Sequence, residues 1–138
     1  MAAALIQLCV DPRLNHELIR IQVRQKLVRL GIGATDVYLL NDIGGNPGQN
    51  LVNTLGLLAR KKDAVAIGAV LHHDDCAAAA QGLRSPLGTA VQQMARMFAK
   101  AGVEAPVLTG QIQTEHNRVF WSDEPAYEYM PFTFGVPR

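Results

Sequence analysis

Short apolar segments alternate along this chain with segments of helical periodicity, and this alternation is the feature that most limits its possible folds. Mostly apolar runs predict buried strands at residues 4–10, 36–40 and 64–71. Helical patterns lie between and after these runs, at residues 15–30, 49–60 and 87–101. Strands that alternate with helices are typical of a parallel sheet covered on both faces. We therefore expect a three-layer α/β/α domain with a central, mainly parallel sheet, spanning residues 1–138 as a single domain.

Local signals fix the ends and faces of these elements. Asn15 can cap the first helix, and Gly31 can end it after Leu30. Its apolar stripe is expected to consist of Leu14, Leu18, Ile21 and Val28, with Val23, Leu27 and Leu30 beside them. The second helix is expected to bury Leu51, Leu55 and Leu58. Residues 106–113 and 117–121 are expected to form one or two further strands around a turn.

Residues able to support chemistry follow two of the predicted strands. Cys9, Asp11 and Arg13 lie at the end of the first strand, and His73 and Cys76 follow the third. In parallel α/β sheets, ligands bind at the carboxyl ends of the strands. If the first and third strands are neighbours, all five side chains meet at one edge of the sheet.

Two thiolates and one imidazole suit a tetrahedral zinc ion whose fourth position stays open for water. Asp11 could then orient that water, and Arg13 could hold the Asp11 carboxylate through a bidentate pair. In the alternative interpretation, the two cysteines are buried apolar residues, Asp11 and Arg13 form a salt bridge at a strand end, and His73 is a turn residue. Spacing alone does not decide between the two interpretations.

Three motifs resemble those of the β-carbonic anhydrase family. Cys9–Arg13, CVDPR, resembles the family's Cys-x-Asp-x-Arg signature at the end of its first strand. Asp36–Gly45, DVYLLNDIGG, is similar to its second strand and the following turn. Ala66–Cys76, AIGAVLHHDDC, resembles its third strand followed by His-x-x-Cys. The later segment GQIQTEHNRVFW is similar to the last core strand and hairpin, so the motifs occur in the family's order.

The resemblance implies an enzyme, a carbonate dehydratase of the lyase class. Its reaction would be the reversible hydration of carbon dioxide to bicarbonate by attack of zinc-bound hydroxide. Zn²⁺ would be held by Cys9, His73 and Cys76, and the candidate catalytic residues would be Asp11 and Arg13. Asp11 would accept a hydrogen bond from the zinc-bound water or, in a closed state, become the fourth ligand, while Arg13 would pair with Asp11. The family builds its sites between subunits, so we expect a homodimer or a larger homo-oligomer.

The chain also departs from the family's usual pattern. The first strand begins almost at Met1, where the family usually has an N-terminal helical arm, and Ala77 stands where glycine is common. Asn41-Asp42 replaces the usual Arg-Asn before the turn. Two alternatives therefore stay open: a hydrolase of carbonyl sulfide or carbon disulfide on the same scaffold, and a zinc-binding homologue without catalysis.

The other histidines and the aromatic residues near the C-terminus are not part of the predicted metal site. His72 has no role in the motif, and we expect it to pack or to form a local hydrogen bond rather than bind metal. His16 and His116 are expected to have no special role. The aromatic residues after Pro125 are candidates for exchange between subunits: Tyr127, Tyr129, Phe132 and Phe134.

Charge and hydropathy exclude some partners. The formal net charge is +1, so no overall field attracts nucleic acid or an anionic membrane, and the basic run at residues 60–62 is expected to be a solvated helix end. No segment approaches the ~20 apolar residues of a spanning helix. The start of the chain lacks the basic region of a signal peptide, and the two cysteines are expected to be reduced. We therefore expect a cytoplasmic protein.

Overall fold

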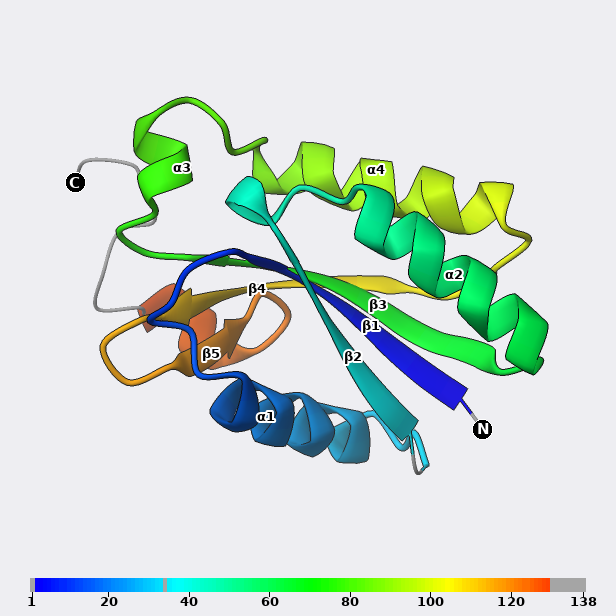
Figure 1. The fold of residues 1–138 in the computed structure, drawn as a ribbon. Coiled ribbons are helices and arrows are strands. Elements are labelled where there is room, and N and C mark those ends of the chain that lie inside the picture. Colours follow the sequence, from blue (N-terminus) through cyan, green and yellow to red (C-terminus); the bar gives the residue numbers. More distant parts are fainter. Residues whose placement is uncertain (1, 34, 130–138) are drawn as a thin grey trace.

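The computed structural model describes residues 2–33 and 35–129, and a five-stranded sheet lies at its centre (Figure 1). The strands are β1 (Ala2–Cys9), β2 (Thr35–Asp42), β3 (Ala64–His73), β4 (Val107–Gln113) and β5 (Arg118–Trp121). Their order across the sheet is β2-β1-β3-β4-β5. The first four strands are parallel, and β5 pairs antiparallel with β4. The prediction of a mainly parallel sheet is confirmed.

Helices cover both faces of this sheet. They are α1 (His16–Arg29), α2 (Gln49–Lys61), α3 (Ala77–Ala80) and α4 (Leu87–Lys100), with short 3-10 helices η1 (Ile43–Gly45) and η2 (Pro125–Tyr129). In Figure 1, α1 lies on one face, α2 and α4 lie on the other, and α3 lies beyond the end of β3. The predicted three-layer α/β/α architecture is confirmed.

Each face of the sheet has its own apolar core. The core beneath α1 is formed by helix side chains packed on alternate strand residues, such as Ile19 and Val23 on Ile6 and Leu71. The core on the other face combines the predicted Leu51, Leu55 and Leu58 of α2 with Met94 and Phe98 of α4. Gly68 of β3 lets α4 approach closely, since a Cβ at this position would lie 2.6 Å from Cζ of Phe98.

The predicted element boundaries differ from the observed ones by at most two residues. Asn15 caps α1 as predicted, its side chain accepting a hydrogen bond from the Leu18 backbone N–H at 3.1 Å. The third strand was predicted to end at residue 71, but β3 continues through His72 and His73 because both pair with β4. Strand β2 likewise extends beyond residue 40 through Asp42.

The predicted apolar stripe of α1 is confirmed only in part, because Leu14, Val23 and Leu27 are buried but the other predicted members are not. The helix residues buried against the sheet are Ile19, Val23, Lys26 and Leu27. Leu18, Ile21 and Val28, which were expected in the core, are 44%, 43% and 76% exposed. The observed stripe contains a lysine, and the apolar pattern did not show that the side with Leu18, Ile21 and Val28 faces solvent.

Lys26 is buried because two acidic side chains reach it from the far end of the chain. Its ammonium donates hydrogen bonds to Asp123 at 2.8 and 3.0 Å and to Glu124 at 2.7 Å. Arg29 also donates to Glu124, at 2.8 and 3.2 Å, and the Lys26 ammonium lies 5.7 Å from the centre of the Trp121 ring. A buried ammonium is tolerated when carboxylates pair with it in this way. These contacts fasten the segment after β5 to α1.

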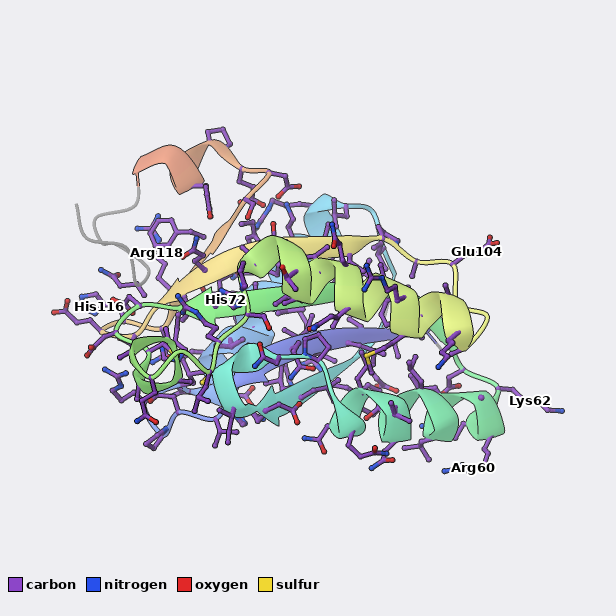
Figure 2. The ribbon with its side chains drawn as sticks, turned by 90° about the horizontal axis from the view of Figure 1, so that it is seen from above. Arg60, Lys62, His72, Glu104, His116 and Arg118 are labelled. Atoms are coloured by element: carbon purple, nitrogen blue, oxygen red, sulfur yellow. The ribbon has the colours of Figure 1, made fainter. Side chains whose placement is uncertain are left out.

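The basic run at the end of α2 faces away from the protein. Figure 2 shows Arg60 and Lys62 extending outward at the end of the molecule opposite His116 and Arg118. Lys61, between them, pairs with Asp63 at 3.2 Å. The arrangement agrees with the predicted solvated helix end. Among the described residues, no helix has the length and apolar character needed to cross a membrane. Phe132 and Phe134 lie outside the described residues.

Glu124→Gln should destabilise the protein by about 1–3 kcal/mol at neutral pH, because it removes the charged acceptor shared by Lys26 and Arg29. Burial alone raises the pKa of Glu124, but hydrogen bonds from Lys26 and Arg29 outweigh burial and leave this pKa below its usual value. A carboxyl with a lowered pKa contributes stability above its unfolded-state pKa, near about 4.3, and loses it as the pH falls through the folded-state pKa. The difference in unfolding free energy between wild type and variant should therefore shrink below about pH 4.

Urea unfolding between pH 3 and 7 measures this effect. Glu17→Gln is the matched control, because Glu17 lies on α1, as Lys26 and Arg29 do, but its side chain is 71% exposed and pairs with Arg20 at 3.6 Å. That variant should change stability by less than about 0.5 kcal/mol. Equal stability of wild type and Glu124→Gln at pH 7 would contradict a stabilising role for the Lys26 cluster.

Candidate metal centre

The parallel pairing of β1 with β3 brings the predicted ligands together. Cys9 ends β1, His73 ends β3, and Cys76 follows three residues later, before α3. The two sulfur atoms lie 3.9 Å apart, and the three ligand atoms all lie within 4.8 Å of one another. Cys9 and Cys76 are 5% exposed and His73 is 1% exposed. The structure thus contains a buried Cys-His-Cys group that could hold a metal ion.

The geometry of the three side chains fits a tetrahedral metal. Two sulfur ligands at about 2.3 Å from one tetrahedral ion are separated by about 3.8 Å, close to the separation observed here. Nδ1 of His73 lies 2.7 Å from the carbonyl oxygen of Asp74, so Nδ1 carries the proton and donates it. This leaves the lone pair of the neutral ring on Nε2, which has no hydrogen-bond partner among the described residues. A buried nitrogen in this state is typical of a metal ligand whose other nitrogen is oriented by the backbone.

Burial also sets the protonation of these side chains. It lowers the pKa of His73, which keeps the imidazole neutral and able to donate its lone pair. It raises the pKa of the Cys9 thiol, although a backbone hydrogen bond from Gly44 opposes this effect. Metal binding must therefore displace a thiol proton, so occupancy should fall as the pH falls.

Asp11 and Arg13 lie beside the three ligands as predicted. Arg13 forms a bidentate pair with the Asp11 carboxylate, Nε to Oδ1 at 3.1 Å and Nη2 to Oδ2 at 2.8 Å. The Arg13 backbone N–H also donates to Oδ1 at 2.9 Å. These hydrogen bonds lower the pKa of Asp11, which keeps it ionised. Oδ2 of Asp11 is 3.7 Å from Nε2 of His73, so the carboxylate faces the space that the ligands enclose.

The turn between His73 and Cys76 is held from both sides by residues that the sequence analysis did not single out. Asp75 contacts Arg13 through its carboxylate at 2.9 Å and through its carbonyl oxygen at 2.7 Å. Asp74 points the other way and accepts hydrogen bonds from the backbone N–H and hydroxyl of Thr114, both at 2.8 Å. The sequence signal that could have predicted these contacts is the pair of adjacent acids between His73 and Cys76.

The β4–β5 hairpin supports the opposite side of the site. Asn117, at its turn, is buried and adopts a positive φ of 52°. Its amide donates to the Arg13 carbonyl at 3.1 Å and accepts from the Asn15 backbone N–H at 2.7 Å. Thus one turn of the hairpin contacts both the Asp11–Arg13 loop and, through Thr114, the ligand-bearing turn.

Asp42, one of the departures from the family pattern, has a structural role behind Cys9. Its carboxylate accepts hydrogen bonds from the buried amide of Gln7 at 2.7 Å and from Asn50 at 3.1 Å. Its carbonyl oxygen accepts from the Val10 backbone N–H at 3.3 Å. Asp42 therefore holds the ends of β1 and β2 together where the chain turns into the site.

A cavity of about 220 Å³ opens beside Cys9 and Asp11. Gln81 contributes a polar group, and the apolar lining comes from Val10, Ile43, Ala77, Ala78 and Leu83. A neutral molecule of a few atoms fits a cavity of this size and character.

The other histidines lie outside the Cys-His-Cys group. His72 is buried in the interior (Figure 2) and is not one of the three grouped ligands. It packs against η1, since a Cβ on Gly45 would lie 3.7 Å from its ring. His16 lies 3.1 Å from the Asn41 side chain, and His116 is 70% exposed.

Fold and site together define an α/β protein with a candidate Cys-His-Cys metal centre. The carbonic anhydrase from Glaciozyma antarctica superposes with a TM-score of 0.50 at 14% identity, covering 86% of this chain and 80% of its own. The β-carbonic anhydrase CafA of the fungal pathogen Aspergillus fumigatus gives a TM-score of 0.50 at 15% identity, covering 90% of this chain and 77% of its own. No protein-family model and no curated protein sequence matches the chain. The chain has the fold of the β-carbonic anhydrases, as its motifs predict.

Cys76→Ser and His73→Gln should each lose most of the bound metal after reloading with Zn²⁺, because a hydroxyl or an amide is a far poorer zinc ligand than a thiolate or imidazole. His72→Gln is the matched control, since it removes a neighbouring buried histidine outside the ligand group and should keep close to one metal ion per chain. Elemental analysis of folded, purified protein measures the content. Equal metal content in the His72 and His73 variants would contradict the assigned ligand set.

Proposed function

We propose that this chain is a zinc enzyme, a carbonate dehydratase that reversibly hydrates carbon dioxide to bicarbonate, with residues 1–138 acting as one zinc domain. The observation that carries the proposal is the restrained Asp11 carboxylate beside the Cys-His-Cys group. A structural metal takes four protein ligands and needs no oriented carboxylate, whereas a catalytic metal takes three and keeps one position open.

Each residue of the site would have a distinct task. Cys9, His73 and Cys76 would hold Zn²⁺, which supplies a nucleophile at neutral pH by lowering the pKa of a coordinated water molecule to about 7. Asp11 would accept a hydrogen bond from that nucleophile and orient it toward the cavity. Arg13 would keep Asp11 ionised and aimed, which agrees with the lowered pKa of Asp11.

The cavity supports a small neutral substrate. Its lining is mostly apolar and lies directly beside Cys9 and Asp11. Moving carbon dioxide from water to such a surface costs little free energy, while bicarbonate needs a polar partner, for which Gln81 is an uncharged candidate in the lining. Carbonyl sulfide and carbon disulfide share the linear shape of carbon dioxide, so they are the substrates to compare.

The redox state of the candidate ligands suggests a cellular compartment. Both cysteines are free thiols, and zinc binding needs them to stay reduced. The cytoplasm maintains thiols in this state, so we propose it as the compartment. The net charge of +1 gives no reason to propose nucleic acid or a membrane as a partner.

Asp11→Asn should keep its zinc but hydrate carbon dioxide at least about tenfold more slowly, a change of about 1.4 kcal/mol in the activation barrier. Arg13→Ala should be nearly inactive with unchanged zinc content, because the freed Asp11 carboxylate would occupy the open position. Oxygen-isotope exchange from labelled bicarbonate, on samples matched for zinc, measures both variants against wild type.

Three outcomes of these assays would contradict the proposal, each in favour of a different interpretation. Equal exchange rates in the three proteins would mean that the Asp11–Arg13 pair is only a salt bridge. Exchange that does not exceed background in wild type would favour a zinc-binding protein without this activity. Faster turnover of carbonyl sulfide or carbon disulfide in a parallel assay would reassign the substrate.

A second copy of the chain is the proposed partner at the cavity. Three apolar residues of the lining are also unusually exposed: Val10 at 59%, Ile43 at 61% and Leu83 at 51%. Clustered exposed apolar side chains are typical of interaction surfaces. A subunit packed here would exclude water from the site, which strengthens electrostatic interactions within it.

Sedimentation at micromolar concentration should therefore detect a dimer or a larger homo-oligomer. Ile43→Asp should shift the protein toward monomer and lower its activity, because it places a charge among these apolar side chains. Val28→Asp is the control, since Val28 is 76% exposed but lies near the end of α1 rather than in the cavity lining. A fully active wild-type monomer would refute the shared site.

A further inference from the structure

The Arg13 guanidinium contacts two partners that come from different strands. One edge holds Asp11, which follows β1, through the bidentate pair at 3.1 and 2.8 Å. Nη1 and Nη2 also reach Asp75, which follows β3, at 2.9 Å for its carboxylate and 2.7 Å for its carbonyl oxygen. The Arg13 guanidinium donates two hydrogen bonds to Asp75, as many as it donates to Asp11, although the family signature contains only the Asp11–Arg13 pair.

The backbone at Asp75 is shaped for this contact. Asp75 directly precedes Cys76 and has a positive φ of 50°, a conformation that residues other than glycine rarely adopt. The resulting turn directs both the side chain and the carbonyl oxygen of Asp75 to the same guanidinium. Since Asp74 is anchored to Thr114 on the other side, only Asp75 joins the ligand-bearing turn to Arg13 among the contacts described.

The position of Arg13 matters because Asp11 is a potential competitor for the metal. Oδ2 of Asp11 lies 3.7 Å from Nε2 of His73. An ion bound about 2.0–2.1 Å from Nε2 would lie within reach of this carboxylate after a small rotation, and carboxylate oxygens are themselves zinc ligands. With a metal bound, the fourth position would therefore stay open only while Arg13 restrained Asp11.

From these contacts we infer that Asp75 is a positioning residue of the site: it fixes Arg13 against the ligand-bearing turn, so that Arg13 holds Asp11 away from the fourth position on the metal. The inference rests on the proposed metal centre but not on any rate of turnover. It makes the turn between His73 and Cys76 both the source of two ligands and the anchor that keeps the fourth position accessible.

Binding of a small anion to Co²⁺-loaded protein tests this inference. Cobalt occupies zinc sites and absorbs visible light, and its spectrum changes when azide takes the fourth position. Asp75→Lys places a like charge beside Arg13, which should weaken the restraint that Arg13 exerts on Asp11. Asp11 should then compete more strongly for the fourth position on the metal, and azide should bind about threefold to fivefold more weakly. Asp75→Asn retains a side-chain oxygen and the backbone carbonyl, so its azide affinity should stay within about twofold of wild type.

The sign of the effect separates this mechanism from a general change in charge. A lysine near the site attracts anions, so electrostatic attraction alone would strengthen azide binding. Glu115→Lys makes the same change of charge at a residue that is 76% exposed on the adjacent hairpin turn, and it should leave binding unchanged or slightly tighter. The backbone conformation of residue 75 is compatible with lysine, because Lys62 adopts a similar φ of 60° in this chain.

Asp11→Asn tests whether the effect of Asp75→Lys depends on Asp11, since it removes the competing carboxylate. In that background Asp75→Lys should no longer weaken azide binding, and this loss of coupling would support the inference whatever the isotope-exchange assay gives. Azide affinity in Asp75→Lys equal to or tighter than wild type would overturn it. Failure of the wild-type protein to take up Co²⁺ would overturn both this inference and the proposed function.

Discussion

Direct hydrogen bonding between β1 and β3 is the constraint on which the candidate site depends. The two strands are parallel and adjacent, so their carboxyl ends lie side by side although Cys9 and Cys76 are 67 residues apart in sequence. A single strand inserted between β1 and β3 would separate their ends by about 9–10 Å instead of about 4.8 Å. Cys9, at the end of β1, would then lie about one strand spacing further from His73 and Cys76, and the three side chains would not converge.

The grouping of Cys9, His73 and Cys76 could be predicted from the sequence because these residues lie at or shortly after the ends of two apolar strands, and the motif resemblance marked them as candidate metal ligands. The residues that hold the ligands could not be predicted in the same way. Thr114 and Asn117 lie in the turn of the β4–β5 hairpin, which is distant from the site in sequence and contacts it only in the folded protein. Asp75 lies inside the recognised motif, yet its backbone conformation and its contact with Arg13 are not visible in residue spacing.

The orientation of α1 shows a different limit of pattern analysis. Apolar residues occur on both sides of this helix, and the sequence offered no reason to place a lysine in the core. The buried side combines Ile19, Val23 and Leu27 with Lys26, whose charge is neutralised by acids almost 100 residues away. A hydrophobic pattern records only the preference of each side chain for water, so it cannot include a partner that arrives from a distant segment.

Burial of Lys26 also links the beginning and the end of the described chain energetically. If the segment after β5 detached while α1 stayed in place, the ammonium would remain among apolar groups without its two carboxylates. Such a partly open state is therefore expensive, and α1, β5 and residues 122–124 should open together or not at all. The hairpin that contacts the candidate metal centre thus belongs to the same cooperative unit as α1.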